Sequence, residues 1–289
     1  MSKAKTVRQI KKIVTGAPAV DGAGVRLVRV IGSSTVQDFD PFLMLDAFDS
    51  TDSSDYVKGF PWHPHRGIET VTWLASGTIE HGDSLGNKGT IRDGDCQWMT
   101  AGSGIIHQEM PMSAPRMLGL QLWVNLPAKD KMTAPKYRDL KASMIPVVEK
   151  DGARIAVIAG KFQETKGAMR GDYVDATVLD ISLKAGSSVS VDVSEQDTVF
   201  VYLIDGDVSF DEGKGDDQTF VERRKAVLLS TGDSAVLTAS PSKDARCVLF
   251  AGSPLRESVA WGGPIVMNTQ EELDLAFREL DDNNFIKHR

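Results

Sequence analysis

A repeated pattern of short strands constrains the fold of this chain more than any other feature of its sequence. The segment IETVTWLASGTIEHGDS, followed by GTIRDGDCQWMTAG, resembles DTVFVYLIDGDVSFDEG, followed by AVLLSTGDSAVLTAS. Each copy has a strand, a glycine turn, a second strand, a Gly-Asp turn and a further strand. A pattern that recurs in this way predicts two copies of one β-domain. The polar stretch LPAKDKMTAPKY is the predicted bridge between the copies.

Strand patterns also dominate the rest of the chain, and sustained helical periodicity is found mainly near its end. The runs GVRLVRVI, VLDISL and TVFVYLI are short and β-rich, as in an antiparallel sandwich or barrel. Thr269 precedes a helical pattern, and Glu272 three residues later completes a capping box. One face of this helix is marked by Leu273, Ala276, Phe277 and Leu280. The sequence therefore predicts a mostly β chain with a short C-terminal helix.

Length and charge exclude several classes of protein. A chain of 289 residues is long enough for two domains, and its formal net charge of −7 disfavours direct binding to nucleic acid. Its two cysteines form no disulfide framework, and no apolar run approaches the length of a membrane span. We therefore expect a cytoplasmic protein that does not bind membranes, with a nuclear location as the alternative in a eukaryote.

Two pairs of residues carry the chemistry. Side chains two apart on a strand share a face, so His63 and His65 point the same way. Glu69 joins that face if the extended conformation continues. Further along the chain, His107 and Glu109 form a second pair with the same spacing. If the two pairs lie on neighbouring antiparallel strands, three imidazoles and a carboxylate converge on one site.

Such a donor set suits a divalent transition metal. Imidazole and carboxylate ligands fit Fe²⁺, and zinc is less favoured because it more comfortably closes a tetrahedron. Mn, Ni, Cu and Zn remain alternatives to iron. The competing interpretation is that these histidines are ordinary surface residues and that Glu109 is a rim charge. The second copy of the repeat has no histidine before His288, so the sequence predicts a metal in the first copy alone.

The chain resembles the pirin family of the cupin superfamily. The resemblance is carried in order by DPFLMLDAF, GFPWHPHRGIETVTWL, HGDSLGNKG, GDCQWMTAGSGIIHQEM, LQLWVNLPAKDKMTAPKY, RIAVIAG and GPIVMN. It implies a bicupin, two tandem β-barrels (double-stranded β-helix or jelly-roll) of which the first holds one metal, usually iron. We expect residues 1–135 to form the metal-binding cupin. Residues 136–289 are expected to form a metal-free cupin with the C-terminal helix.

The resemblance also implies the ligands. The metal ligands of pirins fall on His63, His65, His107 and Glu109, whereas the general cupin pattern would take its carboxylate from Glu69. We follow the pirin assignment and keep Glu69 as a candidate that either supports Glu109 or replaces it as the ligand.

Two activities are associated with the family. One is quercetin 2,3-dioxygenase, which opens the central ring of a flavonol with O₂ and releases carbon monoxide. The alternative is a redox-sensitive interaction module, either a transcriptional co-regulator or a regulator of a metabolic enzyme, in which the metal acts as a switch. We rank the dioxygenase first, with a flavonol-like substrate, O₂ and a monomeric chain. Glu109 is the predicted proton acceptor, and candidates for the wall of the substrate pocket are Phe60, Trp73, Trp98 and Met99.

Overall fold

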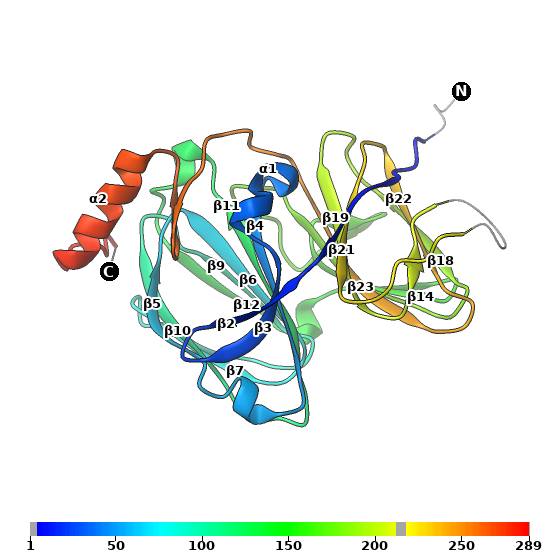
Figure 1. Cartoon of the computed structure of the whole chain (residues 1–289), viewed down its shortest axis with the longest axis horizontal. Helices are drawn as coiled ribbons and strands as arrows, with labels where there is room; N and C mark the ends of the chain where they lie inside the picture. Colours follow the sequence, from blue (N-terminus) through cyan, green and yellow to red (C-terminus); the bar gives the residue numbers. More distant parts are fainter. Residues whose placement is uncertain (1–4, 212–217, 289) are drawn as a thin grey trace. The chain divides into compact units, whose positions relative to one another are not determined.

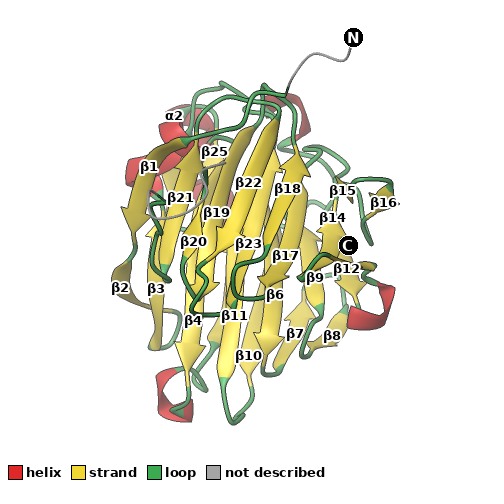
Figure 2. Cartoon of the chain, turned by 90° about the vertical axis from the view of Figure 1, so that its right-hand side faces the viewer, coloured by secondary structure: helices red, strands yellow, loops and turns green. Residues whose placement is uncertain are grey.

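The computed structural model of the protein describes residues 5–211 and 218–288. These residues form two compact units, each built mainly from antiparallel strands (Figure 1). The first unit comprises residues 17–142 and 255–288, and the second comprises residues 5–16 and 143–254. Strands predominate throughout (Figure 2), which confirms the predicted mostly β fold.

The first unit contains two large sheets and a two-stranded one. The larger has seven strands, in the spatial order β12 (Lys136–Leu140), β9 (Cys96–Thr100), β6 (Ile68–Ser76), β11 (Met117–Asn125), β4 (Phe42–Ser50), β3 (Val25–Ile31) and β2 (Ala17–Asp21). The smaller has four, in the order β5 (Phe60–His65), β10 (Ile105–Pro111), β7 (Ile79–Asp83) and β8 (Lys88–Ile91). Short helical turns lie between strands, at η1 (Ser33–Thr35), α1 (Val36–Phe39), η2 (Ser53–Asp55) and η3 (Ala128–Asp130).

The second unit likewise has one seven-stranded sheet, together with a sheet of three strands and one of two. Its seven-stranded sheet has the order β1 (Ile10–Thr15), β21 (Lys225–Leu229), β19 (Thr198–Asp205), β23 (Ala245–Gly252), β17 (Thr177–Leu183), β14 (Ala153–Ala159) and β13 (Val147–Lys150). Its smaller elements are β18 (Ser188–Asp192), β22 (Ser234–Ala239), β20 (Val208–Ser209), β15 (Lys161–Phe162), β16 (Thr165–Lys166) and the turn η4 (Ala142–Met144). The interior is an apolar cluster that includes Ile155, Val201 and Leu249.

The N-terminal strand belongs to the second unit and the C-terminal segment to the first. This division differs from the predicted one into residues 1–135 and 136–289. The N-terminal β1 pairs with β21 of the second unit, with Val14 opposite Ala226. The C-terminal segment, residues 255–288, belongs instead to the first unit. The predicted bridge also lies in the first unit, because β12 pairs with β9. These boundaries are set by pairing between distant strands, which local patterns do not reveal.

The C-terminal segment contains a hairpin and a helix. The hairpin pairs β24 (Ala260–Gly262) with β25 (Ile265–Met267), and α2 (Gln270–Asp281) follows it. The capping box at Thr269 and Glu272 is present as predicted. Of the predicted apolar face, Leu273 and Ala276 are buried, whereas Phe277 stays partly exposed.

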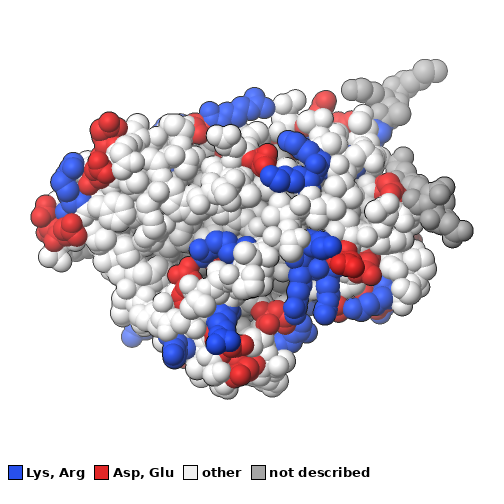
Figure 3. All heavy atoms as spheres, in the orientation of Figure 1, with Lys and Arg blue, Asp and Glu red and all other residues white. Residues whose placement is uncertain are grey.

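Acidic and basic side chains are interspersed on the face seen in Figure 3, with no broad basic surface there. Among the helices of the described ranges, none is long and apolar enough to cross a membrane.

Arg8 provides a test of the exchanged N-terminal strand. It is buried, and its guanidinium donates to the carbonyls of Gly232, Ser230 and Ser194 in the second unit. We expect Arg8→Met to lower the free energy of unfolding of this unit by about 3 kcal/mol, because three backbone carbonyls, of which that of Gly232 belongs to a buried residue, lose a charged donor. The control Lys5→Met removes only an exposed ion pair to Asp192 and is expected to cost less than about 1 kcal/mol.

The positions of the tryptophans make this measurement specific to one unit. All five lie in the first unit, at Trp62, Trp73, Trp98, Trp123 and Trp261. Urea unfolding followed by circular dichroism should therefore shift in Arg8→Met, while the transition seen by tryptophan fluorescence stays in place. A shift seen only in the fluorescence transition would contradict the assignment of the N-terminal strand to the second unit. An equal loss of unfolding free energy in Lys5→Met would contradict it as well.

Candidate metal centre

Strands β5 and β10 bring the predicted pairs together. They are antiparallel neighbours, with His65 opposite Ile105 and His63 opposite His107. Burial alternates along β10, so His107 and Glu109 both face the interior of the first unit. The two pairs therefore lie on neighbouring antiparallel strands, which is the condition for their convergence on one site.

His63, His65 and His107, the histidine triad, form a compact cluster. One ligand nitrogen from each ring lies within 4.8 Å of the others, and no other such group of three or more potential ligands occurs among the described residues. The ring centroids of His63 and His107 are 4.3 Å apart, and those of His65 and His107 are 5.0 Å apart. His65 and His107 are buried, and His63 is half-buried.

Two backbone carbonyls fix the tautomers of His63 and His65. Nδ1–H of His63 donates to the Pro61 carbonyl at 2.8 Å, and Nδ1–H of His65 donates to the Pro264 carbonyl at 3.0 Å. In the neutral rings both Nε2 atoms therefore carry lone pairs. These two nitrogens lie 3.1 Å apart. Two lone pairs at this distance repel each other unless a proton or a metal ion lies between them.

The ring of His107 differs from those of His63 and His65. It is fully buried, and neither of its ring nitrogens has a partner among the described residues. Burial, reinforced by the neighbouring His65 and His63, lowers the pKa of His107 well below its ordinary value. Burial and the adjacent His63 likewise lower the pKa of His65 to about 3. Both rings are therefore neutral at pH 7, which is the form that binds metals.

The triad fits a divalent transition metal. Two nitrogens held about 2.1 Å from one ion and at right angles to each other lie about 3 Å apart, close to the separation of the two Nε2 atoms. A metal would also satisfy one of the orphaned nitrogens of His107. The carbonyls of Pro61 and Pro264 would act as the outer partners that orient metal-binding imidazoles.

The two candidate carboxylates lie beside the triad in hydrogen-bonded positions of their own. Glu109 Oε1 accepts from Thr72 at 2.9 Å, and Oε2 accepts from Gln121 at 2.6 Å. Glu69 Oε1 accepts from Thr100 at 2.6 Å. The compact group includes neither carboxylate, so ligation by Glu109, and the supporting role of Glu69, remain predictions.

The C-terminal segment completes the surroundings of the triad. Besides the Pro264 carbonyl, it supplies Val266, whose amide donates to the carbonyl of Arg66, the residue after His65. Gly67 follows with a φ of 77°, and a Cβ there would collide with the Val266 carbonyl. The glycine of the HPHRG motif therefore permits close approach of β25.

Buried cations hold this segment in place. Arg66 donates to the Phe285 carbonyl at 2.9 Å and pairs with Glu279 of α2 at 2.8 Å. The Lys131 ammonium donates to the carbonyls of Gly67 and Val266 and to Asn125 Oδ1. Burial lowers the pKa of Lys131 to about 7. Sequence reasoning missed these positions because their partners are distant in the chain.

His81 is a further buried residue near the triad that the sequence analysis did not single out. Its ring centroid lies 5.4 Å from that of His107, and its Nε2 lies 3.2 Å from Asp83 Oδ2. On its other side it stacks on Tyr137, at 4.6 Å between centroids. The only sequence signal is its place two residues before Asp83 on β7, which puts both side chains on the inner face.

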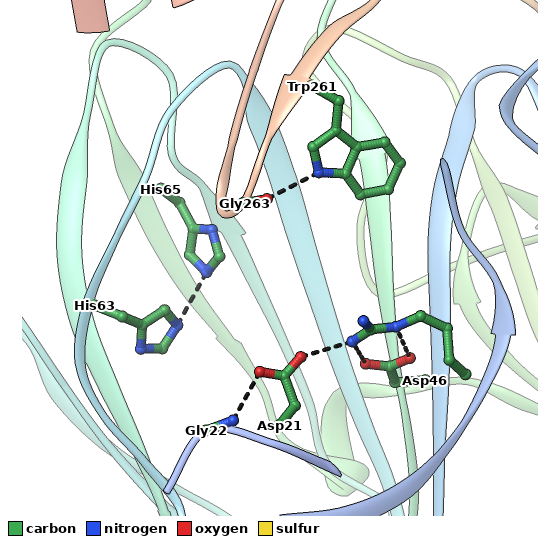
Figure 4. A network of polar contacts seen from close by, with 8 residues as sticks. Asp21, Gly22, Asp46, His63, His65, Trp261 and Gly263 are labelled. Atoms are coloured by element: carbon green, nitrogen blue, oxygen red, sulfur yellow. Dashed lines mark hydrogen bonds and ion pairs between the residues drawn. The ribbon is translucent and has the colours of Figure 1, made fainter. Parts of the chain in front are cut away.

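A cavity of about 740 Å³ opens beside the triad, with His63 and His65 in its wall. Its aromatic lining consists of Phe60, Trp62, Trp123 and Trp261. Of the predicted wall residues only Phe60 lines it, because Trp73, Trp98 and Met99 are buried in the core. Trp123 meets His65 edge-on at 5.0 Å between centroids. Figure 4 shows Trp261 and Gly263 near the two histidines.

Fold and site together define a bicupin with a histidine cluster in its first unit. The sequence models of two families match the chain: "Pirin" over residues 24–124 and "Pirin C-terminal cupin domain" over residues 178–286. The chain belongs to the pirin family.

Relatives and solved structures agree with this assignment. The chain is 44% identical to a pirin-like protein of Caulobacter vibrioides, over 96% of this chain and 99% of that protein. It is 42% identical to pirin of Mus musculus, over 89% and 86% of the two chains. Quercetin 2,3-dioxygenase from Acinetobacter baumannii has a similar structure, with a TM-score of 0.86 and 31% identity over 97% and 99% of the two chains.

Metal binding by the triad can be measured directly. In calorimetric titrations of chelator-treated protein with Fe²⁺ under anaerobic conditions, we expect one ion per chain. His107→Gln should weaken binding by more than about 100-fold, because even the outer partners of metal ligands are worth about 10–100-fold. The exposed His288 provides the control, and His288→Gln should bind like the wild type. Unchanged affinity in His107→Gln would contradict the site.

The buried imidazoles also predict how the stability of the metal-free protein depends on pH. The folded-state pKa values of His65 and His107 lie below the ordinary value of 6.5. The unfolded chain therefore binds more protons than the folded chain below about pH 6.5. We expect the free energy of unfolding to fall as pH decreases from 7 toward 4, and to fall less in His65→Gln. Equal slopes in the two proteins, measured by urea unfolding, would contradict this account.

Proposed function

We propose that this pirin is a metal-dependent dioxygenase of the quercetin 2,3-dioxygenase type. It would open the central ring of a flavonol with O₂ and release carbon monoxide. The observation that carries the proposal is the histidine triad, two members of which face a cavity large enough for a small organic ligand. The similarity to the A. baumannii quercetin 2,3-dioxygenase supports it.

The histidine triad is the proposed metal site, with Glu109 as the fourth ligand and Fe²⁺ as the metal. Imidazole and carboxylate donors suit this ion, and three or four protein ligands leave positions open on a six-coordinate metal. When bound, the ion would supply a Lewis acid for the substrate oxygens and the redox chemistry that O₂ requires. All further steps depend on the residues of the chain.

These residues orient the ligands and shape the cavity. The carbonyls of Pro61 and Pro264 hold His63 and His65 with their Nε2 atoms toward the site. Thr72 and Gln121 hold the carboxylate of Glu109 in place. The aromatic side chains of the cavity favour a flat, largely apolar ring system and displace water from its faces. This environment suits a polyphenol that binds with its oxygen-bearing edge toward the triad.

Aerobic turnover of quercetin tests the proposal. We expect iron-loaded protein to bleach the flavonol absorbance and to release one carbon monoxide per molecule consumed. His63→Ala should reduce turnover at least about 100-fold, whereas His288→Gln should keep the wild-type rate. If fully iron-loaded wild type consumes quercetin no faster than His63→Ala does, the proposal of a dioxygenase is wrong. Partner affinity that differs between Fe²⁺ and Fe³⁺ protein would then favour the interaction module.

A further inference from the structure

Asp21 is a carboxylate that faces the cavity. It is the last residue of β2 and lines the cavity wall together with His63 and His65. Its side chain is 48% exposed, so a ligand can reach it. Figure 4 shows Asp21 between His63 and Asp46.

The turn that carries Asp21 is docked on the strand that carries the histidines. The amide of Ala23 donates to the carbonyl of Gly59 at 2.9 Å, immediately before β5 begins. Gly22 has a φ of 56°, and a Cβ there would collide with the Gly59 carbonyl and the Phe60 ring. Asp21 is therefore held at a fixed position relative to His63, four residues after Gly59.

Arg29 fixes the orientation of the Asp21 carboxylate. The buried Asp46 holds this guanidinium through two hydrogen bonds, from Nε at 2.9 Å and from Nη2 at 2.7 Å. The same Nη2 donates to Asp21 Oδ2 at 2.7 Å. Asp21 Oδ1 accepts from the amide of Gly22 at 2.7 Å. Since a carboxylate offers about four acceptor positions, Asp21 keeps acceptor capacity for a ligand.

Asp21 is ionised at neutral pH. Partial burial raises the pKa of Asp21, but hydrogen bonds from Arg29 and Gly22 outweigh that effect, and its pKa falls below the ordinary value. A carboxylate in this state is a hydrogen-bond acceptor at the edge of the histidine triad.

Glu109, the proton acceptor expected from the sequence, has different surroundings. It is 2% exposed, and both its oxygens already accept hydrogen bonds from Thr72 and Gln121. Neither Glu109 nor His107 is among the residues that line the cavity. A substrate in the cavity therefore meets Asp21 before it can meet Glu109.

We propose that Asp21 is a catalytic residue that accepts the proton of the substrate hydroxyl, an inference that rests on the proposed function. The O–H bond of the 3-hydroxyl breaks, its proton bonds to a carboxylate oxygen of Asp21, and the electron pair stays on the substrate oxygen. The substrate class is a flat aromatic enol whose hydroxyl lies beside a carbonyl. Because Asp21 is partly exposed, the proton passes on to solvent.

Three variants of the iron-loaded full-length protein test this assignment. Asp21→Asn removes the proton acceptor, and Glu109→Gln removes the competing one. Asp49→Asn is the matched control, since Asp49 also pairs with an arginine, Arg116 at 2.8 Å, and does not line the cavity. The probes are quercetin, whose absorbance shifts to longer wavelength on deprotonation, and a flavone that lacks the 3-hydroxyl. Binding is measured anaerobically, flavone binding by quenching of tryptophan fluorescence, and metal content is determined for each variant.

We expect the deprotonation shift at neutral pH in the wild type and in Asp49→Asn. Asp21→Asn should bind quercetin without the shift, lose about 100-fold in turnover, and keep wild-type metal content and flavone affinity. If Asp21→Asn shows the same absorbance shift and the same turnover rate as Asp49→Asn, the proposal is wrong. An equal loss of flavone binding would also overturn it, because Asp21 would then only shape the cavity.

The remaining outcomes separate this inference from the proposed function. If fully metal-loaded Glu109→Gln loses the shift while Asp21→Asn keeps it, the proton acceptor is Glu109 and the inference fails. If the wild type deprotonates quercetin but does not turn it over, only the proposed dioxygenase activity is wrong. Loss of the absorbance shift in Asp21→Asn would then still support Asp21 as the proton acceptor. A wild type that binds no flavonol overturns both.

Discussion

Two backbone carbonyls determine what the first unit can bind. Pro61 and Pro264 each accept an Nδ1–H, which turns the lone pairs of His63 and His65 toward each other at 3.1 Å. His107 adds two buried nitrogens without hydrogen bonds. Burying such groups unpaired costs about 1–3 kcal/mol each. A cation that all three imidazoles share removes much of this cost, so the arrangement is understandable as a metal site and hard to explain as a packed core.

The architecture around the triad places the second of these carbonyls, that of Pro264, beside His65. Pro61 is local to β5, but Pro264 lies 199 residues beyond His65 and reaches it only because the C-terminal segment packs on the first unit. Arg66, Gly67 and Lys131 form the surface that receives this segment. The HPHRG motif thus combines two functions: its histidines belong to the triad, and its last two residues dock the distant hairpin. The second unit keeps the fold with an apolar interior and supplies none of the triad.

Local periodicity predicted much of this structure. Alternation placed His63 with His65, and His107 with Glu109, on common faces, and the repeat predicted two β-domains. What local patterns could not predict was long-range pairing. The exchanged termini, the Pro264 carbonyl and the tryptophans of the cavity all depend on strands that meet from distant parts of the chain. Asp21 was missed for the same reason, because its place beside the triad results from a turn docked on Gly59.

X-ray absorption of the iron-loaded protein tests the central claim most directly, because it counts the ligands of the ion without a substrate. The account predicts a single ion with three imidazole nitrogens at about 2.1 Å, together with oxygen ligands and no sulfur. In His107→Gln, the multiple-scattering signal of imidazole should correspond to two rings in place of three. A first shell with fewer than two imidazoles, or with a sulfur ligand, would show that the metal binds elsewhere and would contradict the assignment of the triad.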